Sequence, residues 1–544
     1  MSVLDDGAMQ PYALTLDKFL DHAAKWHPRS GVSSARADAG PRRVDYAELR
    51  ERALAVSGVL RGLGVAARER VATLAWNTHA HMEAWYGIVG MGAVCHTLNP
   101  RLTAEQSASM IAASGARVLM VSADLLGLAQ DIAQRSPLLE QLLVIDGDVP
   151  GASAACPVVR PLVRPLEPLL AAAPRDASWG GFDETTPAGL CFTSGTTGAP
   201  KGVTYTHRSS YLHTLRFLQA DVGAITSADS VLAVVPMFHA NAWGLPYAAP
   251  AVGARLVLPG RWTDGASLAR LIEQEQVTLG VGVPTVWLGL AEHLEATGRR
   301  LPSLRRVLVG GAPLAQGLMD RLERVLGVVV QTSWGMTELS PAGTVAPPQD
   351  ARRTASVSGR PALGVDLLLV DEQGCALPEQ RAAEGRLRVR GATVVWRYLG
   401  QDAPAVDADG WFDTGDLARI DAQGNLTVTG RAKDLIKSGG EWINPAQIEA
   451  IVGALPQVSL AAVIGRPDAR WGERPILIVE MRKDQSCADE DLLEALRGRV
   501  ASWWIPDAVV RLGRMPMAAT GKVDKMRLRA EYGRAPAGVP GARR

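Results

Sequence analysis

The chain has 544 residues, of which 47% are hydrophobic and 21% charged, and its formal net charge is +1. A chain of this length exceeds one ordinary core and indicates a large domain with at least one smaller domain beside it. The near-neutral charge argues against nucleic-acid and membrane-surface partners, because both favour strongly basic surfaces.

The N-terminus and the cysteines predict a cytoplasmic protein. The N-terminal segment is acidic and has no basic stretch before an apolar core, so it does not have the pattern of a signal peptide. No window reaches the ~18 consecutive apolar residues of a membrane span. The cysteines are scattered and lack a Cys-x-x-Cys spacing, which predicts free buried thiols and neither zinc nor disulfides. They are Cys95, Cys156, Cys191, Cys375 and Cys487.

Apolar, β-branched segments alternate with helical patterns along most of the chain up to GRAKD (430–434). This alternation predicts α/β layers with largely parallel sheets. A helix is expected between two of the strands, at 104–115. The predicted strands are 70–77, 92–99, 116–124, 141–148, 230–239, 254–260, 277–284, 304–311 and 327–335.

Two stretches interrupt this pattern. Residues 149–183 are rich in Pro and Ala and have little periodicity, which predicts a long surface connection. From about Val357 the strands become shorter, and Gly and Asp-Gly turns recur between them. Such turns predict antiparallel strands in a small, barrel-like sheet.

A compact α/β unit follows GRAKD (430–434). Helices are predicted at 445–455 and 489–504, and strands at 460–465 and 475–482. We place a domain boundary near Lys433, which divides the chain into residues 1–432 and 433–544.

The most distinctive motif is the run CFTSGTTGAPKGVTYTH at 191–207, which continues an apolar strand. A glycine-rich loop that leaves a strand can point several backbone N–H groups at one anion, and the hydroxyls and Lys201 add donors and charge. The run therefore favours a polyphosphate site over an ordinary flexible loop. It is not a Walker A loop, because Pro200 precedes the lysine and Gly202 follows it.

Four later segments accompany this loop: TSWGMTE (332–338), FDTGD (412–416), GRAKDLIKSGGEWINP (430–445) and ATGKVDK (519–525). In this order and spacing the set resembles the adenylate-forming superfamily, which comprises acyl-CoA synthetases, nonribosomal peptide adenylation domains and firefly-type luciferases. The resemblance extends over about residues 190–525. It implies a large N-terminal adenylation domain of layered α/β sheets, a small barrel-like subdomain, and a small mobile α+β lid domain with a catalytic lysine.

The resemblance implies a two-step reaction that uses ATP, Mg²⁺ and CoA. A carboxylate attacks the α-phosphate of ATP to give acyl-adenylate and pyrophosphate, and the CoA thiol then displaces AMP. Such chemistry needs positioning and charge neutralisation more than covalent help from the protein. The residues implied in nucleotide binding are Thr193, Ser194, Gly195, Thr196, Thr197, Gly198, Lys201, Gly311, Ala312, Pro313, Thr332, Ser333, Trp334, Gly335, Thr337, Asp416, Arg431, Lys433 and Lys437.

Catalytic and metal-binding roles follow from the same resemblance. The implied catalytic residues are Lys201, Thr337, Glu338 and Lys522. Lys522 is expected to bridge the substrate carboxylate and the α-phosphate, a role that suits a long, flexible ammonium. Glu338, together with the hydroxyl of Thr193, is the implied Mg²⁺ ligand, because this hard cation prefers carboxylate and phosphate oxygens.

The resemblance also assigns the nucleoside. Trp334 is expected to cover one face of adenine, and the segment Gly311, Ala312 and Pro313 to line the other. Asp416 is expected to accept hydrogen bonds from the ribose hydroxyls, with Arg431 in support.

The lid is expected to rotate at Lys433 between the two half-reactions. Gly439 and Gly440 would then approach the cleft and line a narrow thiol channel. One position departs from the family pattern: Ala518 stands where Thr or Ser is usual, which removes one supporting hydrogen bond.

The acid site is indicated by PMFHANAWGLP at 236–246. His239 resembles the family's residue at the entrance of the acyl pocket, although a lone histidine is otherwise more often structural. Trp243 and Trp442 resemble the subgroup that activates medium- and long-chain fatty acids, and the alternative for Trp243 is core packing. The implied substrate-binding set is His239, Trp243, Gly311, Gly439, Gly440 and Trp442.

Several functions stay open at this level. The same subgroup contains ligases for short thioether acids such as 3-methylmercaptopropionate, and an apolar pocket separates neighbouring chain lengths by only ~1–3 kcal/mol per methylene. An adenylation module that loads a carrier protein is less favoured, because no carrier-like serine motif is present. A non-catalytic relative is disfavoured because Lys201, Glu338, Asp416, Arg431 and Lys522 are all retained. The family also allows a homodimer.

Overall fold

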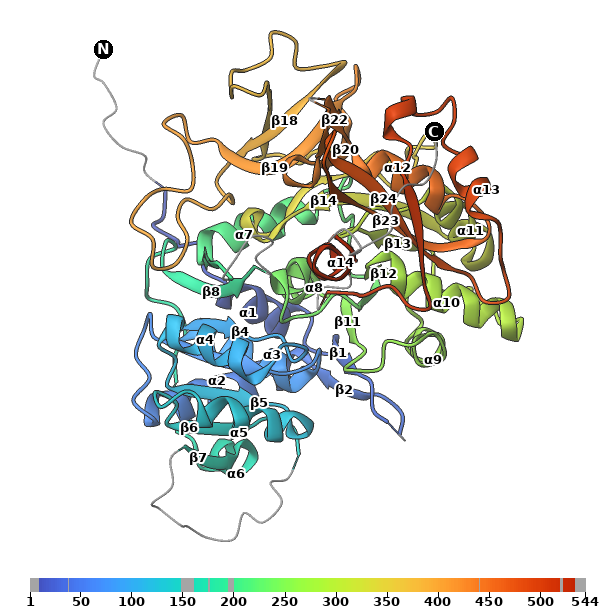
Figure 1. The fold of residues 1–544 in the computed structure, drawn as a ribbon. Helices are drawn as coiled ribbons and strands as arrows, with labels where there is room; N and C mark the ends of the chain where they lie inside the picture. The colour runs from blue at the N-terminus through green and yellow to red at the C-terminus, as the bar shows by residue number, and fades with distance from the viewer. Residues whose placement is uncertain are drawn as a thin grey trace, which may run out of the picture.

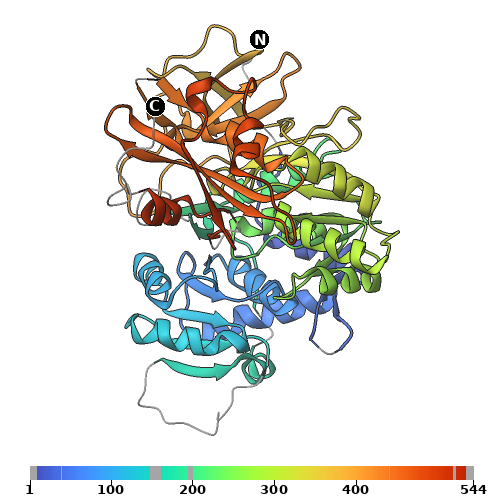
Figure 2. The same cartoon turned by 45° about the vertical axis from the view of Figure 1, so that its right-hand side comes forward.

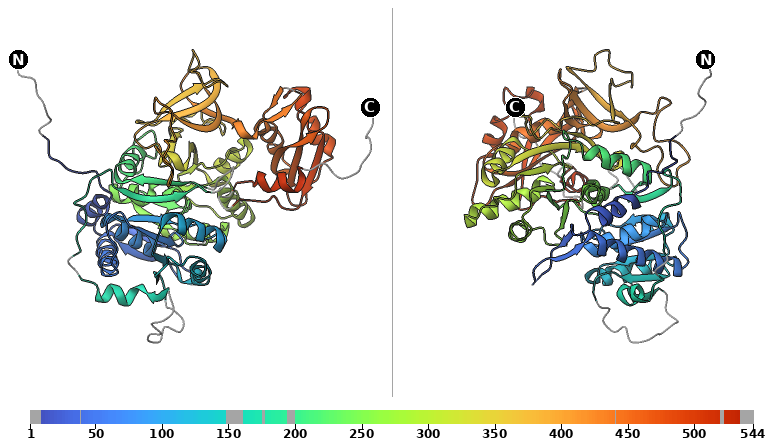
Figure 3. Two further views of the ribbon diagram at one scale, coloured as in Figure 1. Left: turned by 60° about the vertical axis from the view of Figure 1, so that its left-hand side comes forward. Right: turned by 180° about the vertical axis from the view of Figure 1, so that it is seen from behind.

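The computed structural model describes residues 9–37, 39–147, 161–174, 177–193, 200–439, 441–518 and 522–533. Figure 1 shows the early, blue to cyan elements at one end, green and yellow elements in the middle, and a small orange sheet at the other end. The red C-terminal elements form a small domain beside them, which we call the lid and which the left view of Figure 3 shows set off to one side of the main body.

One large sheet has seven strands, and all neighbouring pairs are parallel except β8 with β9. Its order is β7 (Leu162–Pro165), β6 (Gln141–Val144), β5 (Val118–Val121), β3 (Arg70–Leu74), β4 (Val94–Thr97), β8 (Pro187–Phe192) and β9 (Gly202–Thr206). The four strands predicted between residues 70 and 148 are confirmed, and so is the parallel character of the sheet.

The second large sheet has nine strands, parallel in the centre and antiparallel at both ends. Its order is β16 (Arg360–Pro361), β15 (Ala342–Val345), β14 (Val329–Gly335), β13 (Arg306–Val309), β12 (Leu279–Gly282), β10 (Ser230–Ala233), β11 (Arg255–Leu258), β1 (Gly31–Ser34) and β2 (Arg42–Asp45). The five strands predicted between residues 230 and 335 are all present.

Helices cover these sheets and share one core between them. The bounds are α1 (Asp17–Trp26), α2 (Tyr46–Gly62), α3 (His79–Gly90), α4 (Ala104–Ser114), α5 (Leu126–Gln134), α6 (Leu166–Ala172), α7 (His207–Phe217), α8 (Leu245–Val252), α9 (Gly265–Glu275), α10 (Pro284–Thr297) and α11 (Gln316–Leu326). The main apolar cluster takes residues from both sheets. Within it, Trp85 of α3 donates to the hydroxyl of Tyr247 of α8 at 2.5 Å, so helices from distant parts of the sequence are joined.

Helix α4 shows why the helix predicted at 104–115 forms. Thr103 precedes it and accepts the backbone N–H of Gln106 at 3.2 Å, while the side chain of Gln106 accepts the N–H of Thr103 at 3.1 Å. This reciprocal cap satisfies two donors that a helix start leaves unpaired. Gly115, at φ +68°, ends the helix in the left-handed conformation that glycine adopts most readily.

The expectation for residues 149–183 was wrong in part. Strand β7 and helix α6 lie within this segment, and β7 extends the edge of the seven-stranded sheet beside β6. Both elements are only partly buried, because an edge strand and its surface helix need few apolar residues. Their periodicity in sequence is accordingly weak.

The predicted antiparallel sheet consists of four strands in linear order. They are β17 (Asp366–Val370), β18 (Ala383–Arg390), β19 (Phe412–Ile420) and β20 (Leu426–Arg431). All three pairings are antiparallel. Strand β19 alternates buried and partly or fully exposed side chains, which places one face against an apolar cluster that also contains Trp334.

The lid is a five-stranded sheet with helices. Its elements are β21 (Ile436–Ser438), β22 (Glu441–Ile443), α12 (Pro445–Gly453), β23 (Val458–Asp468), β24 (Gly472–Met481), α13 (Asp489–Glu494), β25 (Ala508–Leu512) and α14 (Lys525–Tyr532). The helix predicted at 489–504 was too long, because α13 ends at Glu494 and Gly498 takes a left-handed φ of +69°. Figure 2 shows the lid from the side on which it crosses in front of the small orange sheet.

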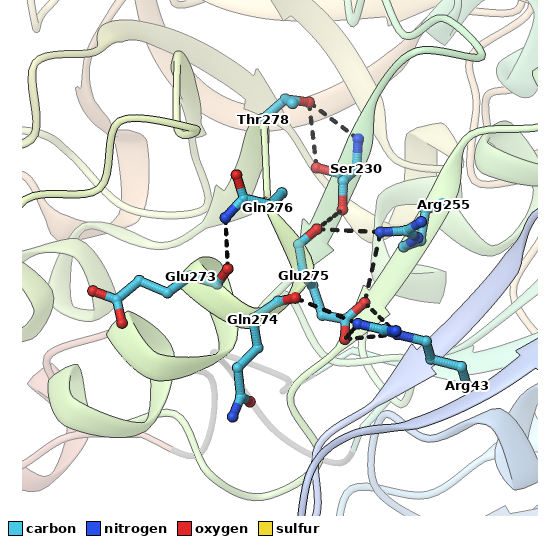
Figure 4. A network of polar contacts seen from close by, with 8 residues as sticks. All are labelled: Arg43, Ser230, Arg255, Glu273, Gln274, Glu275, Gln276 and Thr278. Atoms are coloured by element: carbon cyan, nitrogen blue, oxygen red, sulfur yellow. Dashed lines mark hydrogen bonds and ion pairs between the residues drawn. The ribbon is translucent and has the colours of Figure 1, made fainter.

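A buried carboxylate fastens the edge strand β2 to the nine-stranded sheet (Figure 4). Glu275, at the end of α9, has no exposed side-chain surface and accepts from Arg43 of β2 at 3.0 Å. Arg255 of β11 lies 3.8 Å from the other carboxylate oxygen. The hydroxyl of Ser230 donates to the Glu275 carbonyl at 2.9 Å, so strand β10 is tied to the same point.

Candidate active site

The predicted phosphate loop is the tip of the β8–β9 hairpin. The backbone N–H of Thr193 donates to the carbonyl of Lys201 at 2.9 Å and closes the loop at its base. A side chain at Gly202 would lie 3.0 Å from Cβ of Leu399, so glycine permits the close approach of the 398–399 segment. The predicted phosphate-binding residues Ser194, Gly195, Thr196, Thr197 and Gly198 lie outside the described residues.

Tyr398 joins two of the predicted catalytic side chains. The ammonium of Lys201 lies 4.8 Å from the centre of its ring, and its hydroxyl donates to Oε1 of Glu338 at 3.0 Å. Burial and the Glu338 carboxylate raise the pKa of Tyr398, so the hydroxyl keeps the proton that it donates. The sequence interpretation did not identify this residue. In the sequence, Tyr398 is only an aromatic residue in the loop before β19, which does not indicate a role in the site. An isolated β-bridge between Val203 and Tyr398 brings this loop next to the base of the phosphate loop.

The turn between β14 and β15 presents Thr337 and Glu338, and its backbone is held at both residues. The hydroxyl of Tyr205, on β9, donates to the carbonyl of Thr337 at 2.8 Å. The N–H of Val395 donates to the carbonyl of Glu338 at 2.7 Å. Both residues are buried, so protein contacts fix the backbone of this turn.

Asp416 is the centre of a buried polar group. Its Oδ2 accepts the indole N–H of Trp334 at 2.9 Å, and its Oδ1 pairs with Nε of Arg431 at 2.7 Å. Arg431 also donates to the carbonyl of Thr414 at 3.0 Å. Burial raises the pKa of Asp416, and Arg431 and the Trp334 N–H act in the opposite direction. The indole that was expected to cover adenine is thus oriented by the carboxylate expected to bind ribose.

The predicted adenine and acyl segments lie against each other. The indole of Trp243 lies beside Gly310 and Gly311, where a side chain at either glycine would meet it at 3.0 and 3.5 Å. The hydroxyl of Ser333 donates to the carbonyl of Val309 at 3.1 Å, while that of Thr332 donates to Val357 at 2.5 Å. Ala312 and Pro313 follow Gly311 at the carboxyl end of β13.

Trp243 belongs to an unusual backbone turn. The φ values of Ala240, Asn241, Ala242, Trp243 and Gly244 are all between +44° and +78°. Four of these residues have side chains, for which the left-handed region costs about 1–2 kcal/mol each. Buried contacts hold the turn in place: Cys191 of β8 donates to Oδ1 of Asn241 at 3.2 Å. Strain of this kind is typical of functional segments.

His239, just before this turn, is neutral. Burial and the nearby Lys522 ammonium lower its pKa to about 4. The charge of the lid lysine therefore acts on the predicted entrance of the acyl pocket.

Lys522 is solvent-exposed and ends a short loop of the lid. Its loop is closed by the N–H of Ala518, which donates to the Lys522 carbonyl at 2.7 Å, so the alanine that departs from the family pattern keeps a backbone bond. Desolvation by the surrounding protein lowers the pKa of Lys522, although the residue keeps a solvent-exposed surface. Arg431 and Lys433 also lower it, whereas Asp416 and Glu338 raise it. The charge of Lys522 is thus coupled electrostatically to Asp416 and Glu338 of the predicted nucleotide site.

The remaining lid residues lie in or next to the β21–β22 hairpin. The ammonium of Lys437 lies 5.3 Å from the ring centre of Trp442, which is half exposed. Gly439, at φ +61°, donates its N–H to the carbonyl of Trp471 at 2.7 Å, and a side chain there would meet that indole. Gly440 lies outside the described residues. Burial lowers the pKa of Lys433 at the predicted hinge.

The donor set suits a magnesium ion shared with phosphate. Among the described residues, no three His, Cys, Asp or Glu side chains gather into a metal site. Mg²⁺ usually needs only one or two carboxylates, with phosphate and water oxygens completing its shell. Glu338 could supply such a carboxylate, and Thr193 is the predicted hydroxyl ligand. The ion would neutralise phosphate charge.

The layered α/β domain with its small C-terminal domain, and the ion pair of Asp416 and Arg431, fit an adenylate-forming enzyme. The chain belongs to the AMP-binding enzyme family, whose sequence profile matches residues 20–399, and the profile of the AMP-binding enzyme C-terminal domain matches residues 447–522.

Characterised relatives match the chain over nearly its full length. It is 38% identical to a 3-methylmercaptopropionyl-CoA ligase of Ruegeria lacuscaerulensis, over 97% of this chain and 98% of that protein. It is also 38% identical to a medium-chain-fatty-acid–CoA ligase of Ectopseudomonas oleovorans, over 97% of both chains. The structure of ATP-bound MatB from Rhodopseudomonas palustris superimposes with a TM-score of 0.82 at 25% identity, covering 95% of this chain and 99% of that one.

The protein is an AMP-forming acid–CoA ligase with ATP and CoA as co-substrates, as the sequence motifs predicted. None of the helices in the described part of the chain has both the length and the apolar character needed to cross a membrane.

Proposed function

We propose that the acid is a medium- or long-chain fatty acid. The support is the apolar indole of Trp243, which packs on the main core and lies directly against Gly310 and Gly311. An acid whose carboxylate is activated beside this segment must run its chain past the indole. An apolar chain suits such a wall, because burying each methylene contributes about 0.8 kcal/mol.

A short thioether acid such as 3-methylmercaptopropionate is the second candidate. Ligases named for that acid and for medium-chain fatty acids match this chain at the same 38% identity. The indole would then close the pocket and leave room for only a short chain. For a fatty acid, the indole of Trp243 would lie along the acyl chain. For a short thioether acid, the indole would form the closed end of the pocket.

We assign the half-reactions to different positions of the lid. Lys522, beside Asp416 and Glu338, serves adenylation, with Lys201 and Thr337 on the phosphates and Glu338 and Thr193 on Mg²⁺. Rotation at Lys433, between residues 1–432 and 433–544, then removes Lys522 and presents the hairpin of Gly439, Gly440 and Trp442 to the thiol. The proposed setting is the cytoplasm, with a homodimer as the proposed assembly.

The experiment is an acid panel with ATP, Mg²⁺ and CoA, in which AMP and acyl-CoA are measured for straight-chain acids of increasing length, aryl acids and 3-methylmercaptopropionate. Highest kcat/KM for a medium- or long-chain acid supports the proposal, and a maximum at the short thioether acid overturns it in favour of the second candidate. Trp243→Ala should extend the preference to longer chains if the indole ends the pocket. It should leave the preferred length unchanged if the indole borders the chain.

A further inference from the structure

We propose that His213 and Arg216 of α7 are positioning residues that clamp the turn bearing Thr337 and Glu338 and connect it to the turn bearing Trp243. The roles of those turns rest on the proposed function. Neither His213 nor Arg216 belongs to a motif that the sequence interpretation used. Both side chains are buried, with exposed fractions of 1% and 4%.

His213 lies between the two turns. Its Nε2 accepts the backbone N–H of Ala342 at 3.3 Å, at the end of the turn that bears Glu338. The opposite edge of the ring faces Gly244, the last residue of the left-handed turn, where a Cβ would lie 2.8 Å from Nδ1. Because Gly244 has φ +78°, only glycine fits that position without strain or clash. The imidazole of His213 thus lies between the turn that bears Trp243, in the predicted acid pocket, and the turn that bears Glu338, in the predicted nucleotide site.

Arg216, one helical turn after His213, binds the other backbone group of Ala342, which is its carbonyl. It donates to the carbonyl of Ala342 at 2.6 Å and to Oγ1 of Thr393 at 3.2 Å. The carbonyl of Thr393 accepts in turn from the hydroxyl of Ser340 at 2.9 Å. Ala342 is therefore fixed at both its N–H and its C=O by a single helix, and the turn before it is fixed at Ser340.

The energetics favour a specific role for this arginine. Within the described part of the chain the Arg216 guanidinium bonds only to neutral oxygens, without a carboxylate partner, and burial lowers its pKa to about 10. A buried charge without a counter-ion destabilises a fold, and apolar residues of similar size are often neutral or better at such positions. The presence of an arginine here indicates that this position needs a side chain whose N–H groups can bond to Ala342 and Thr393 at the same time.

The two residues also support each other. Because Ala342 donates to Nε2, this nitrogen must be unprotonated. Burial and the adjacent Arg216 charge both lower the pKa of His213 well below its usual value, so the imidazole stays neutral and keeps the acceptor.

A displacement of Ala342 would also displace the adjacent turn that bears Thr337 and Glu338. The N–H of Met336 donates to the carbonyl of Pro341 at 3.0 Å, so the two ends of the turn are joined around Thr337 and Glu338. Loosening Ala342 should therefore impair the half-reaction that uses Glu338, and spare the half-reaction that does not.

The decisive variant is His213→Phe, which keeps the ring and removes the acceptor. We expect adenylation kcat, measured by acid-dependent ATP–pyrophosphate exchange, to fall roughly 10- to 100-fold, the scale of a buried donor left unpaired. Thioester formation from supplied acyl-adenylate should stay close to that of the parent. Equal losses in both half-reactions, or a lower Tm with no kinetic effect, would overturn the proposal.

His207→Phe is the matched control. His207 lies on the same helix, is also buried, and accepts one backbone N–H, that of Leu16 at 3.1 Å, but it faces α1 instead of the catalytic turn. It should lower Tm and leave both half-reactions unchanged. A selective loss of adenylation in His207→Phe would show that any disturbance of α7 suffices, and the clamp would fail.

Two further variants keep the test informative if His213→Phe does not fold. His213→Gln retains an acceptor and should recover most of the adenylation rate. Arg216→Met removes a buried charge and should fold while losing adenylation selectively; normal adenylation in Arg216→Met contradicts the clamp. If the parent accepts no fatty acid, the proposed acid class fails by itself. The clamp is then measured with the acid that works, or by affinity for a Mg²⁺-bound non-hydrolysable ATP analogue.

Discussion

Tyr398 shows how one side chain can organise several charges. Its ring lies beneath the Lys201 ammonium while its hydroxyl binds the Glu338 carboxylate, so the cation and the anion are held apart by one rigid group. Without such a spacer, Lys201 and Glu338 could pair directly and neutralise each other. Each charge instead stays available for phosphate or metal.

Tyr398→Phe should reduce adenylation about tenfold, because a hydrogen bond to a charged group contributes about 1.5–3 kcal/mol and 1.4 kcal/mol corresponds to a factor of ten. The phenyl ring keeps its place under Lys201, so the loss reports the Glu338 bond. The KM for MgATP should rise, as measured by pyrophosphate exchange at varied Mg²⁺. Tyr46→Phe is the control, since that buried hydroxyl donates to Ala254 at 2.5 Å and should affect Tm alone. An unchanged MgATP dependence in Tyr398→Phe would contradict the spacer role.

Local motifs in the sequence suffice to propose roles for Lys201, Glu338 and Asp416. They could not predict Tyr398, His213 or Arg216, because their roles arise only when distant strands and helices meet. The indole of Trp334 illustrates the same limit. Its motif predicted an adenine contact, whereas its hydrogen bond to Asp416 depends on β19, which lies about eighty residues further along the chain.

At the scale of elements, long apolar strands were the most predictable features. Buried parallel strands are nearly continuous apolar runs, so β3 to β6 and β10 to β14 could be recognised directly. The edge strand β7, the shortened α13 and the left-handed turn at Ala240–Gly244 could not. For β7 and the left-handed turn, tertiary contacts outweigh the conformational preference of the local sequence. For α13, the left-handed conformation of one glycine outweighs it.

Glu275→Gln should destabilise the edge of the nine-stranded sheet. Removing one member of a buried ion pair typically costs 3–5 kcal/mol. Here the loss should be nearer 1–3 kcal/mol, because Arg43 and Arg255 are 63% and 45% exposed and can be hydrated when released. Urea unfolding should show the lower midpoint, with both half-reactions intact at low urea.

The control for this change is Glu273→Gln, two residues earlier on α9. Its carboxylate pairs with Arg299 at 2.6 Å, and both side chains are partly exposed. Exposed pairs contribute about 0–1 kcal/mol, so its urea midpoint should barely change. Equal shifts in the two variants would mean that the network in Figure 4 does not stabilise the sheet.

At the scale of the whole molecule, the side chain of Asn444 links the two sides of the predicted boundary at Lys433. Asn444, at the start of α12, donates to the carbonyl of Thr429 on β20 at 2.7 Å, and its Oδ1 accepts from the N–H of Ala446 at 3.1 Å. The side chain thereby caps a lid helix and fixes the lid against the main body. Rotation of the lid at Lys433 would either break the hydrogen bond between Asn444 and Thr429 or move both residues together.

Gly430→Ala should shift the balance of lid positions. A Cβ at Gly430 would lie 2.6 Å from Oδ1 of Asn444, whose two hydrogen bonds leave it little freedom to move. The lid position with Lys522 near Asp416 is therefore disfavoured, and adenylation should fall several-fold, since a lost cap contributes about 1 kcal/mol. Thioester formation from supplied acyl-adenylate should be retained. Gly453→Ala, where a Cβ meets nothing within 4 Å, should leave both half-reactions unchanged. A loss of thioester formation in Gly430→Ala equal to its loss of adenylation would refute two lid positions with separate tasks.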